Sequence, residues 1–570
     1  MDRRTFLSGT GDLAEIRDDP VTGISPFANT TLPAITRTGA GLEPYEGPWG
    51  ATQIVHLLRR TTFGPVPAHV ALLKSMSVKL AVDMLTAIPP EEPSLPLNVD
   101  SRDVVPVGGS WAYAIKQDPA SGSFNPSYVR TVSLKSWWME LLLKQQLSLR
   151  ERMVLFWHTH FVTETDVVNE PRFYFRYLST LRTHALGSWK DLVRLMTLDG
   201  AMLKYLNGNT NTKSSPNENF GRELQELFTI GKGPEIGPGD YTTYTENDVK
   251  AAAKVLTGWQ EDATLLTIPG SSPWKFTASR HDTANKQFSA RYGDRVITGG
   301  TDGLAELNAM LDMIFAQSET ARSLCRKLYR YFVYYVIDDW TEANIIEPLA
   351  AQLRANNYNV APVLSTLLGS AHFFDPVNMA CMIKSPIELV AGVTRLFAIA
   401  LPADTVLLYK ILSYLVTQAA GVQQELGNPP NVAGWPAYYQ TPQYYELWIN
   451  SDTLPKRTAF TSAMAKNGYS TGGFKLAIDV LLYTTGFANP SDPNALIDEA
   501  AATILAMPLT ENQKAFLKQT LLPGLPDYEW TAEWAAYLAD PGNSTKSTPV
   551  RTKLQTLYGF MMSMPEFQLL

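Results

Sequence analysis

Residues 215–231 read SPNENFGRELQELFTIG, and this stretch predicts an amphipathic helix with a dense polar face. Its apolar residues recur every three or four positions, which is typical of a helix packed against a core on one side. Ser215 and Glu218, with Pro216 between them, predict a capping box at the start. Gly231 predicts a left-handed residue at the end. We therefore expect a helical fold that holds polar groups against its core.

The polar face of this helix supplies the first candidate site. Glu223 and Glu226 are three positions apart, as paired carboxylates are in acid–base pairs and metal sites, and they are candidate catalytic residues. Asn217, Asn219 and Arg222 are candidate binding residues, and Arg222 can pair with Glu226 within the helix. The alternative is a buried polar network that keeps helices in register. The spacing alone fits both.

Composition limits the class of protein. The chain has 570 residues, of which 45% are hydrophobic and 18% charged, so it is globular. Its formal net charge is −7 and it has no basic tract, so nucleic acid is an unexpected partner. No apolar run is long enough to span a bilayer. Two cysteines exclude a disulfide framework.

Most of the chain shows helical periodicity, so the expected fold class is mainly α. We predict a large multi-helix orthogonal bundle with a small β-hairpin insert and long irregular loops. The hairpin is expected from the β-prone runs at 274–276 and 295–298. A second capping box is expected at 245–248, with Gly258 ending the helix that follows.

The predicted domain organisation follows the chain in four regions. An extended arm covers 1–50, and a helical region with the polar centre covers 51–260. The small β insert covers 261–300. A second helical region covers 301–570 and includes an aromatic loop at 427–450.

His158 and His160 are candidate metal ligands in the run FWHTHF, residues 156–161. On a helix their side chains lie about 200° apart, so they cannot bind one metal together without a break in the helix. Each would need partners from other helices to hold a divalent metal. The alternative is that one imidazole is a core residue and the other belongs to a polar cluster.

His281 is a further candidate catalytic residue, because Asp282 follows it directly and Lys286 lies nearby. Asp282 and Lys286 are candidate binding residues, and Asp282 could orient the imidazole. These residues fall in the irregular insert, where functional groups are frequent. The alternative is a surface loop of mixed charge.

The aromatic loop begins with NPPNVAGWP at 428–436. Asn431, Trp435, Tyr438, Tyr439 and Trp448 are candidate binding residues, because rigid aromatic loops can stack on sugars or peptides. Such a loop can equally plug the end of a helical bundle. We expect Trp435 to act as the plug and some of the tyrosines to be exposed.

The N-terminal run RRTFL, residues 3–7, resembles a twin-arginine export motif. A charged segment follows it where a signal peptide would be apolar. A cytoplasmic location is therefore expected if the motif is non-functional.

These motifs together resemble the bacterial family called domain of unknown function 1800. The resemblance covers about residue 52 to the C-terminus and rests on ten segments. They are 56–64, 156–161, 216–224, 244–249, 256–259, 281–282, 383–386, 429–436 with 448–450, and 565–568. The chain departs from the family pattern at Gly221, where Ala is usual, and at 437–439, which replaces a Gly-rich step.

The resemblance implies a periplasmic or extracellular location and a possible partner, a sulfatase-like protein of the domain of unknown function 1501 family. It implies no activity and no catalytic residue. Our first hypothesis is an envelope-associated protein that binds or assembles a partner protein or a glycan. The alternative is a hydrolase-like enzyme with a His/Glu polar centre, with or without a metal.

Overall fold

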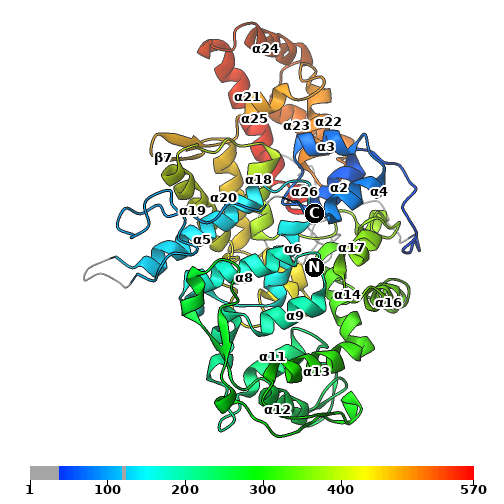
Figure 1. Cartoon of the computed structure of the whole chain (residues 1–570). Coiled ribbons are helices and arrows are strands. Elements are labelled where there is room, and N and C mark those ends of the chain that lie inside the picture. Colours follow the sequence, from blue (N-terminus) through cyan, green and yellow to red (C-terminus); the bar gives the residue numbers. More distant parts are fainter. Residues whose placement is uncertain (1–37, 91, 118–123) are drawn as a thin grey trace. The chain divides into compact units, whose positions relative to one another are not determined.

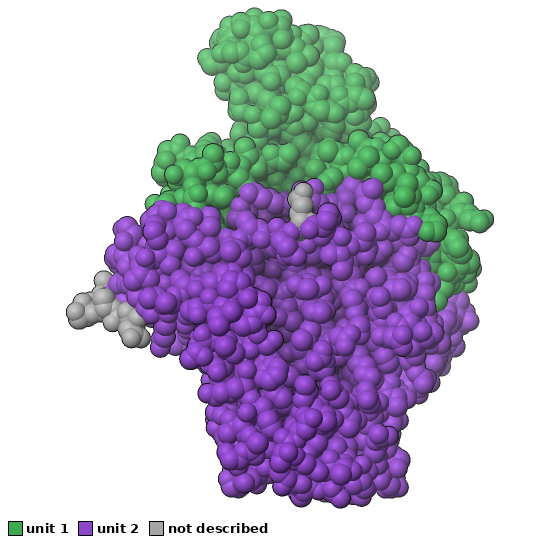
Figure 2. All heavy atoms as spheres, viewed as in Figure 1, with its two compact units in different colours: residues 1–81, 370–424, 440–570 green, residues 82–369, 425–439 purple. Residues whose placement is uncertain are grey.

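The computed structural model describes residues 38–90, 92–117 and 124–570. The chain divides into two compact units, and each is built from segments that are far apart in the sequence (Figure 2). Unit 1 comprises Met1–Ala81, Ser370–Gln424 and Gln440–Leu570, and unit 2 comprises Val82–Gly369 and Glu425–Tyr439. The residue 3–7 motif and most of the predicted arm at 1–50 lie outside the described residues.

Unit 1 is mainly helical (Figure 1). Its α-helices are α2 (Ala51–Thr61), α3 (Pro67–Leu73), α18 (Pro386–Leu396), α19 (Thr405–Gly421), α20 (Thr453–Ala465), α21 (Val480–Thr485), α22 (Pro493–Ile504), α23 (Glu511–Leu521), α24 (Asp527–Ala539), α25 (Ser544–Ser563) and α26 (Pro565–Gln568). Short 3₁₀ turns occur at Pro376–Asn378 and Tyr444–Trp448. Helix α20 packs on α25, and α18 packs on α19.

Unit 2 is also mainly helical, and α4 (Val78–Thr86) leads into it. Its α-helices are α5 (Pro126–Leu143), α6 (Arg150–His160), α7 (Thr165–Val168), α8 (Pro171–Thr183), α9 (Trp189–Thr197), α10 (Gly200–Tyr205), α11 (Glu218–Glu226), α12 (Glu246–Val255), α13 (Gly303–Ala316), α14 (Ser318–Phe332), α15 (Asp339–Thr341), α16 (Glu347–Ala355) and α17 (Val360–Leu368). A single π turn, Glu342–Ile346, joins α15 to α16. Its 3₁₀ turns are Gly208–Thr210, Ala263–Thr267, Ala278–Arg280, Ala290–Tyr292 and Pro436–Tyr438.

Within the described ranges, the strands form four separate antiparallel pairs. These pairs are β1 (Glu235–Gly237) with β2 (Asp240–Tyr241), β3 (Trp259–Glu261) with β4 (Trp274–Phe276), β5 (Lys286–Gln287) with β6 (Val296–Ile297), and β7 (Tyr469–Thr471) with β8 (Phe474–Leu476). The two predicted strands exist as β4 and β6, but they do not pair with each other. Each pairs with a strand nearer in sequence, which closes a shorter loop.

Aromatic side chains fill the cores of both units. Trp137, Trp157 and Trp189 are buried in unit 2, and Trp530 and Trp534 are buried in unit 1. Such side chains bury large areas of apolar surface. Helix packing around them confirms the mainly α class.

Both cysteines, Cys325 and Cys381, are buried and free. Among the residues that the structure describes, no helix is both long enough and apolar enough to cross a membrane.

Candidate functional site

Helix α11 begins two residues later than the sequence predicts. Its N-cap is Asn217, whose side-chain oxygen accepts a hydrogen bond from the Asn219 amide at 2.9 Å. Ser215 instead closes a tight turn with Thr212. The predicted capping box at Ser215 is therefore wrong, because Asn217 is itself a strong cap nearer to the helix.

Asn217 and Asn219 also hold the loop before α11. The Asn217 side chain donates to the carbonyl oxygen of Asn207 at 3.1 Å, and the Asn219 side chain donates to that of Leu206 at 3.3 Å. Asn219 is exposed. Both candidate binding residues thus have positioning contacts, and Asn219 also faces solvent.

Helix α12 packs closely against α11. The predicted capping box at Thr245 and Asp248 is confirmed at its start, and Gly258 has a φ of 92° beyond its end. A Cβ atom at Gly221 would lie 3.0 Å from the Ala253 amide nitrogen and 3.1 Å from the Val249 carbonyl oxygen. The glycine therefore permits the close approach of the two helices.

Arg222 joins these two helices at the surface. Its guanidinium donates to both carboxylate oxygens of Glu246, at 2.5 and 2.6 Å, and lies 3.8 Å from Glu218. The expected pair of Arg222 with Glu226 does not form, because Glu246 offers two-point binding from the neighbouring helix. Arg222 is thus held away from the carboxylate pair.

Glu223 and Glu226 lie half-buried on the next part of α11. Tyr244 donates a hydrogen bond to Glu226 at 2.8 Å, and the Lys232 ammonium is 3.7 Å from the same carboxylate. Among the described residues, none donates a hydrogen bond to the Glu223 carboxyl. Burial, followed by the negative charge of Glu226, raises the pKa of Glu223 to about 7.

Tyr205 and Glu164 extend this group of acids. Tyr205 donates to Glu164 at 2.7 Å, and both side chains are half-buried. Burial, the hydrogen bond to Glu164 and the charges of Glu164 and Glu223 raise the pKa of the Tyr205 phenol. We call Glu164, Glu223 and Glu226 the carboxylate cluster. It combines three acids with two tyrosine hydroxyl groups, from Tyr205 and Tyr244.

His158 lies elsewhere, buried among aromatic rings in unit 2. Its Nδ1 atom is 2.9 Å from the Tyr177 hydroxyl, which itself donates to the Phe161 carbonyl oxygen at 2.6 Å. The imidazole must therefore donate from Nδ1, which leaves Nε2 as the unprotonated nitrogen. Burial, and secondly the charge of Lys135, lowers the pKa of His158 to about 3.

His160 contacts a carbonyl group just beyond the end of α11. Its Nε2 atom donates to the Phe228 oxygen at 3.1 Å, and its Nδ1 atom is 3.3 Å from the Lys327 ammonium. Lys327, on α14, also donates to the Leu227 oxygen at 2.5 Å. These two side chains satisfy carbonyl groups that the end of a helix leaves unpaired, and so they position α11.

His281 belongs to a third, fully buried group. Its Nε2 atom is 3.2 Å from Glu306, and its Nδ1 atom is 2.9 Å from the carbonyl oxygen of Thr257. Lys286 donates to Glu306 at 2.5 Å and to the main-chain oxygen of Asp282. The surface-loop alternative is wrong here, because His281 and Lys286 are at most 1% exposed. The group links strand β5 to helix α13.

The aromatic loop divides between the two units. In unit 2, Trp435 is buried and packs against His158, with ring centroids 5.5 Å apart, while Tyr438 packs on Tyr331. Tyr439 is 39% exposed. Trp448 is buried in unit 1.

The predicted site residues therefore fall into several places. Glu223 and Glu226 lie together, whereas the hydrogen-bond partners of the three imidazoles do not include either acid. Within the described ranges, no three His, Cys, Asp or Glu side chains converge in a way that could hold a metal ion. Metal binding by His158 and His160 stays a prediction without support from this arrangement.

The sequence reasoning missed three contributors to this region, namely Glu164, Tyr205 and Lys327. They come from segments up to 163 residues apart in the chain (327 − 164), so no local spacing connects them. Tyr244 could have been found, because it directly precedes the capping box of α12.

The comparisons with known proteins point to one family. A family model described as "Protein of unknown function (DUF1800)" matches residues 56–569. Neither the curated proteins nor the solved structures contain a match to this chain. Because the family model covers nearly the whole chain and includes the carboxylate cluster, this protein is a member of the DUF1800 family.

Proposed function

We propose that this protein is a hydrolase-like enzyme that performs acid–base chemistry at Glu223 and Glu226. One observation carries the proposal. The Glu223 carboxyl is half-buried, has no hydrogen-bond donor among the described residues, and has a pKa of about 7. A general acid or base works best when its pKa lies near the working pH. Perturbed carboxyl groups of this kind are frequent in active sites.

The two carboxyl groups have different roles in this proposal. Tyr244 donates a hydrogen bond to Glu226, and the Lys232 ammonium lies 3.7 Å from the same carboxylate. Glu223 exchanges a proton near neutral pH. Glu223 donates that proton to the leaving group, and Glu226 receives a proton from the attacking water. Such a division between neighbouring carboxyl groups is a recurrent pattern in hydrolases.

The surroundings favour a polar substrate without negative charge. Glu164, Glu223 and Glu226 repel anions, and the nearby Arg222 is already bound to Glu246. Tyr205 adds a hydroxyl group beside Glu164, and Asn219 is exposed on the same helix as Glu223 and Glu226. We therefore infer a neutral glycan as the substrate class. His281 has no part in this proposal, since both its ring nitrogens face buried partners.

The test is hydrolysis of a panel of neutral oligosaccharides and nitrophenyl glycosides by the full-length protein. Glu223→Gln should reduce turnover by about a hundredfold or more, as expected for loss of a general acid. Glu218→Gln, on the first turn of the same helix, is the matched control and should retain activity. Equal activity of the two variants, or no hydrolysis by the wild type, would contradict the proposal.

A second candidate function is binding or assembly through the unit 2 part of the aromatic loop. Tyr439 is exposed, and the Asn431 side chain donates to its hydroxyl group at 2.9 Å. This contact fixes an aromatic ring in place before any partner arrives, which lowers the entropic cost of binding. A glycan or the sulfatase-like partner inferred from the family resemblance would fit this function.

Glycan-array binding and pull-down with the family partner test this second candidate. Tyr439→Ala should weaken capture, while Tyr128→Ala, at another exposed tyrosine of unit 2, should not. Unchanged capture by Tyr439→Ala would argue against the loop as a binding surface.

A further inference from the structure

The aromatic loop begins beside the carboxylate cluster, within unit 2. Thr165 directly follows Glu164, and its hydroxyl group donates a hydrogen bond to the side-chain oxygen of Asn428 at 2.6 Å. The Thr165 amide donates to the carbonyl oxygen of Gly427 at 2.8 Å. The start of the loop is thus fixed to the residue that follows one acid of the cluster.

Glu164 also connects this part of the loop to the two acids on α11. Tyr205 donates a hydrogen bond to Glu164 at 2.7 Å. The carbonyl oxygen of the next residue, Leu206, accepts a hydrogen bond from the Asn219 side chain at 3.3 Å. Asn219 lies one helical turn before Glu223 on α11. A continuous series of contacts therefore leads from the acids to the start of the loop.

The end of the unit 2 part of the loop lies on a helix that also contacts the α11 region. Tyr438 packs on Tyr331 of α14, with ring centroids 5.7 Å apart. Lys327 lies one turn earlier on α14 and donates to the Leu227 oxygen just beyond α11. Both ends of this part of the loop are thus attached to elements that contact the carboxylate cluster or its helix.

Half-buried or exposed side chains line this series of contacts, namely Glu164, Tyr205, Asn428, Asn431 and Tyr439. The Asn431 side chain donates to the Tyr439 hydroxyl at 2.9 Å, and its oxygen accepts from the Ala433 amide at 2.9 Å. The exposed ring is therefore held by a side chain that is itself fixed. An aromatic face with nearby amide and hydroxyl groups suits a neutral sugar, which has apolar faces and polar edges.

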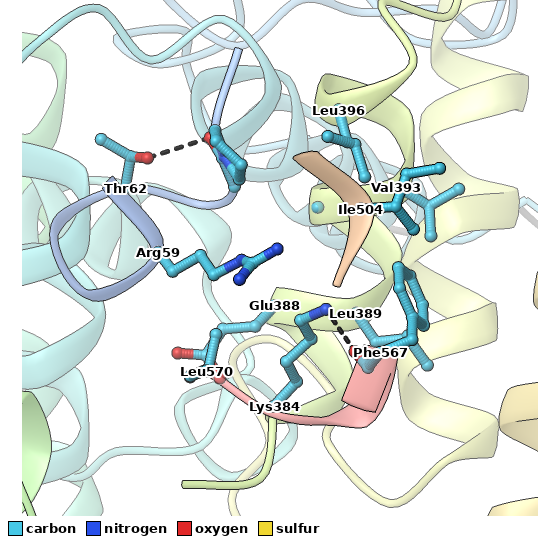
Figure 3. Close-up of a pocket in the computed structure, with 13 residues that line it drawn as sticks. Arg59, Thr62, Lys384, Glu388, Leu389, Val393, Leu396, Ile504, Phe567 and Leu570 are labelled. Atoms are coloured by element: carbon cyan, nitrogen blue, oxygen red, sulfur yellow. Dashed lines mark hydrogen bonds between the residues drawn. The ribbon is translucent and has the colours of Figure 1, made fainter. Parts of the chain in front are cut away.

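The pocket in Figure 3 lies in unit 1 and is too small for a sugar ring. Arg59, Lys384 and Phe567 line it, and Lys384 donates a hydrogen bond to the Phe567 carbonyl oxygen (Figure 3). Its volume is about 20 Å³. A cavity of that size holds about one water molecule. A wider pocket of unit 1, of about 260 Å³, has mainly apolar walls that include Val55 and Leu505. Neither lining includes a residue of the carboxylate cluster.

We propose that the carboxylate cluster and the unit 2 part of the aromatic loop form one extended glycan site. This rests on the proposed function, because Glu223 and Glu226 are taken as the place where the bond is cleaved. Tyr439 binds a sugar away from that bond, and Asn431 holds the ring in place. Contacts with remote sugars supply binding energy that positions the reacting bond, so a longer chain is the better substrate. The substrate class is thereby narrowed to neutral oligosaccharides.

The test compares two chain lengths with the full-length protein. The kcat/KM for a neutral hexasaccharide is measured beside that for the nitrophenyl glycoside of the same sugar. The wild type should prefer the hexasaccharide by about tenfold or more, as expected for one well-placed aromatic contact. Tyr439→Ala should raise KM for the hexasaccharide and lose most of this preference. Tyr439→Phe keeps the ring and should retain most of it. Tyr528→Ala, at an exposed tyrosine of unit 1, is the matched control and should retain all of it.

The results distinguish failure of this inference from failure of the proposed function. If Glu223→Gln reduces hydrolysis as expected but Tyr439→Ala keeps the wild-type preference, the extended site is wrong and the proposed function stands. A wild type that cleaves both substrates equally well has the same meaning. If the wild type hydrolyses neither substrate, both proposals fail.

Discussion

Two residues one helical turn apart, Glu223 and Glu226, differ in what surrounds their carboxyl groups. Glu226 has a tyrosine hydroxyl and a lysine for its charge, whereas no described residue donates to Glu223. The same helix thus supplies one carboxyl group with two polar partners and one, Glu223, whose pKa burial raises to about 7. The sequence spacing predicts the pair but not this difference, because Tyr244 and Lys232 come from the segment after the helix.

The raised pKa of Glu223 has a consequence for stability. The folded protein holds this proton more tightly than the unfolded chain does, so the contribution of Glu223 to stability is lost as pH rises from about 4.5 to about 7. The melting temperature of Glu223→Gln should therefore exceed that of the wild type at pH 8 but not at pH 4. Differential scanning calorimetry at both pH values measures this, with Glu218→Gln as the control. An identical offset at both pH values would contradict the assigned titration.

His158 gives the opposite dependence. Its pKa of about 3 lies below that of an exposed histidine, so below pH 6.5 the unfolded chain binds a proton that the folded protein excludes. Its contribution to stability is present above pH 6.5 and is lost as pH falls toward 3. His158→Phe retains an aromatic ring. The melting temperature of this variant should lie closer to that of the wild type at pH 4.5 than at pH 7.5. If the two melting temperatures differ by the same amount at both pH values, the loss of stability in acid has a cause other than His158.

At the scale of elements, the sequence predicts a feature correctly where both interacting residues lie close together in the chain. Thr245 and Asp248 predict the start of α12, because both halves of a capping box lie within four residues. The start of α11 was misplaced because Ser215 and Asn217 both can cap a helix, and the turn with Thr212 decides between them. The pairing of β4 and β6 was also wrong, because short strands carry little information about their partners.

The buried group of His281, Lys286 and Glu306 should determine how firmly β5 and β6 are held against α13. Lys286→Met leaves Glu306 buried without its lysine, and loss of one partner of a buried ion pair costs about 3–5 kcal/mol. Amide hydrogen exchange in β5 and β6 should then accelerate, since their opening becomes easier. The double variant Lys286→Met/Glu306→Leu removes both charges and should recover much of the protection. Equal exchange in the two variants would show that the charge pair does not hold these strands.

At the scale of the whole molecule, each unit combines segments that are far apart along the chain. No periodicity or motif in the sequence indicates this arrangement. In unit 1 the last residues pair with a segment near residue 384. The Lys384 amide donates to the Gln568 oxygen at 2.8 Å, and the Leu570 amide donates to the Met382 oxygen at 2.7 Å. The predicted four-region division at 50, 260 and 300 stays a prediction.

Removal of residues 565–570 should therefore destabilise unit 1 as a whole. The deletion exposes Lys384 and Arg457, which lose hydrogen bonds to Phe567 and Gln568. We expect a lower melting temperature and faster trypsin cleavage within unit 1, with unit 2 cleaved at the wild-type rate. Mass spectrometry of the fragments distinguishes the two units. Wild-type resistance of the truncated protein would show that this segment is dispensable.

The burial of Trp435 against His158 places a constraint on the order in which the protein can be completed during synthesis. The ribosome releases residues 82–369 long before residues 425–439, which belong to the same unit. Until the later segment emerges, the aromatic surroundings of His158 lack Trp435. A fragment that stops at residue 369 would carry this gap permanently. To express unit 2 alone, residues 425–439 should therefore be joined to residues 82–369 through a linker.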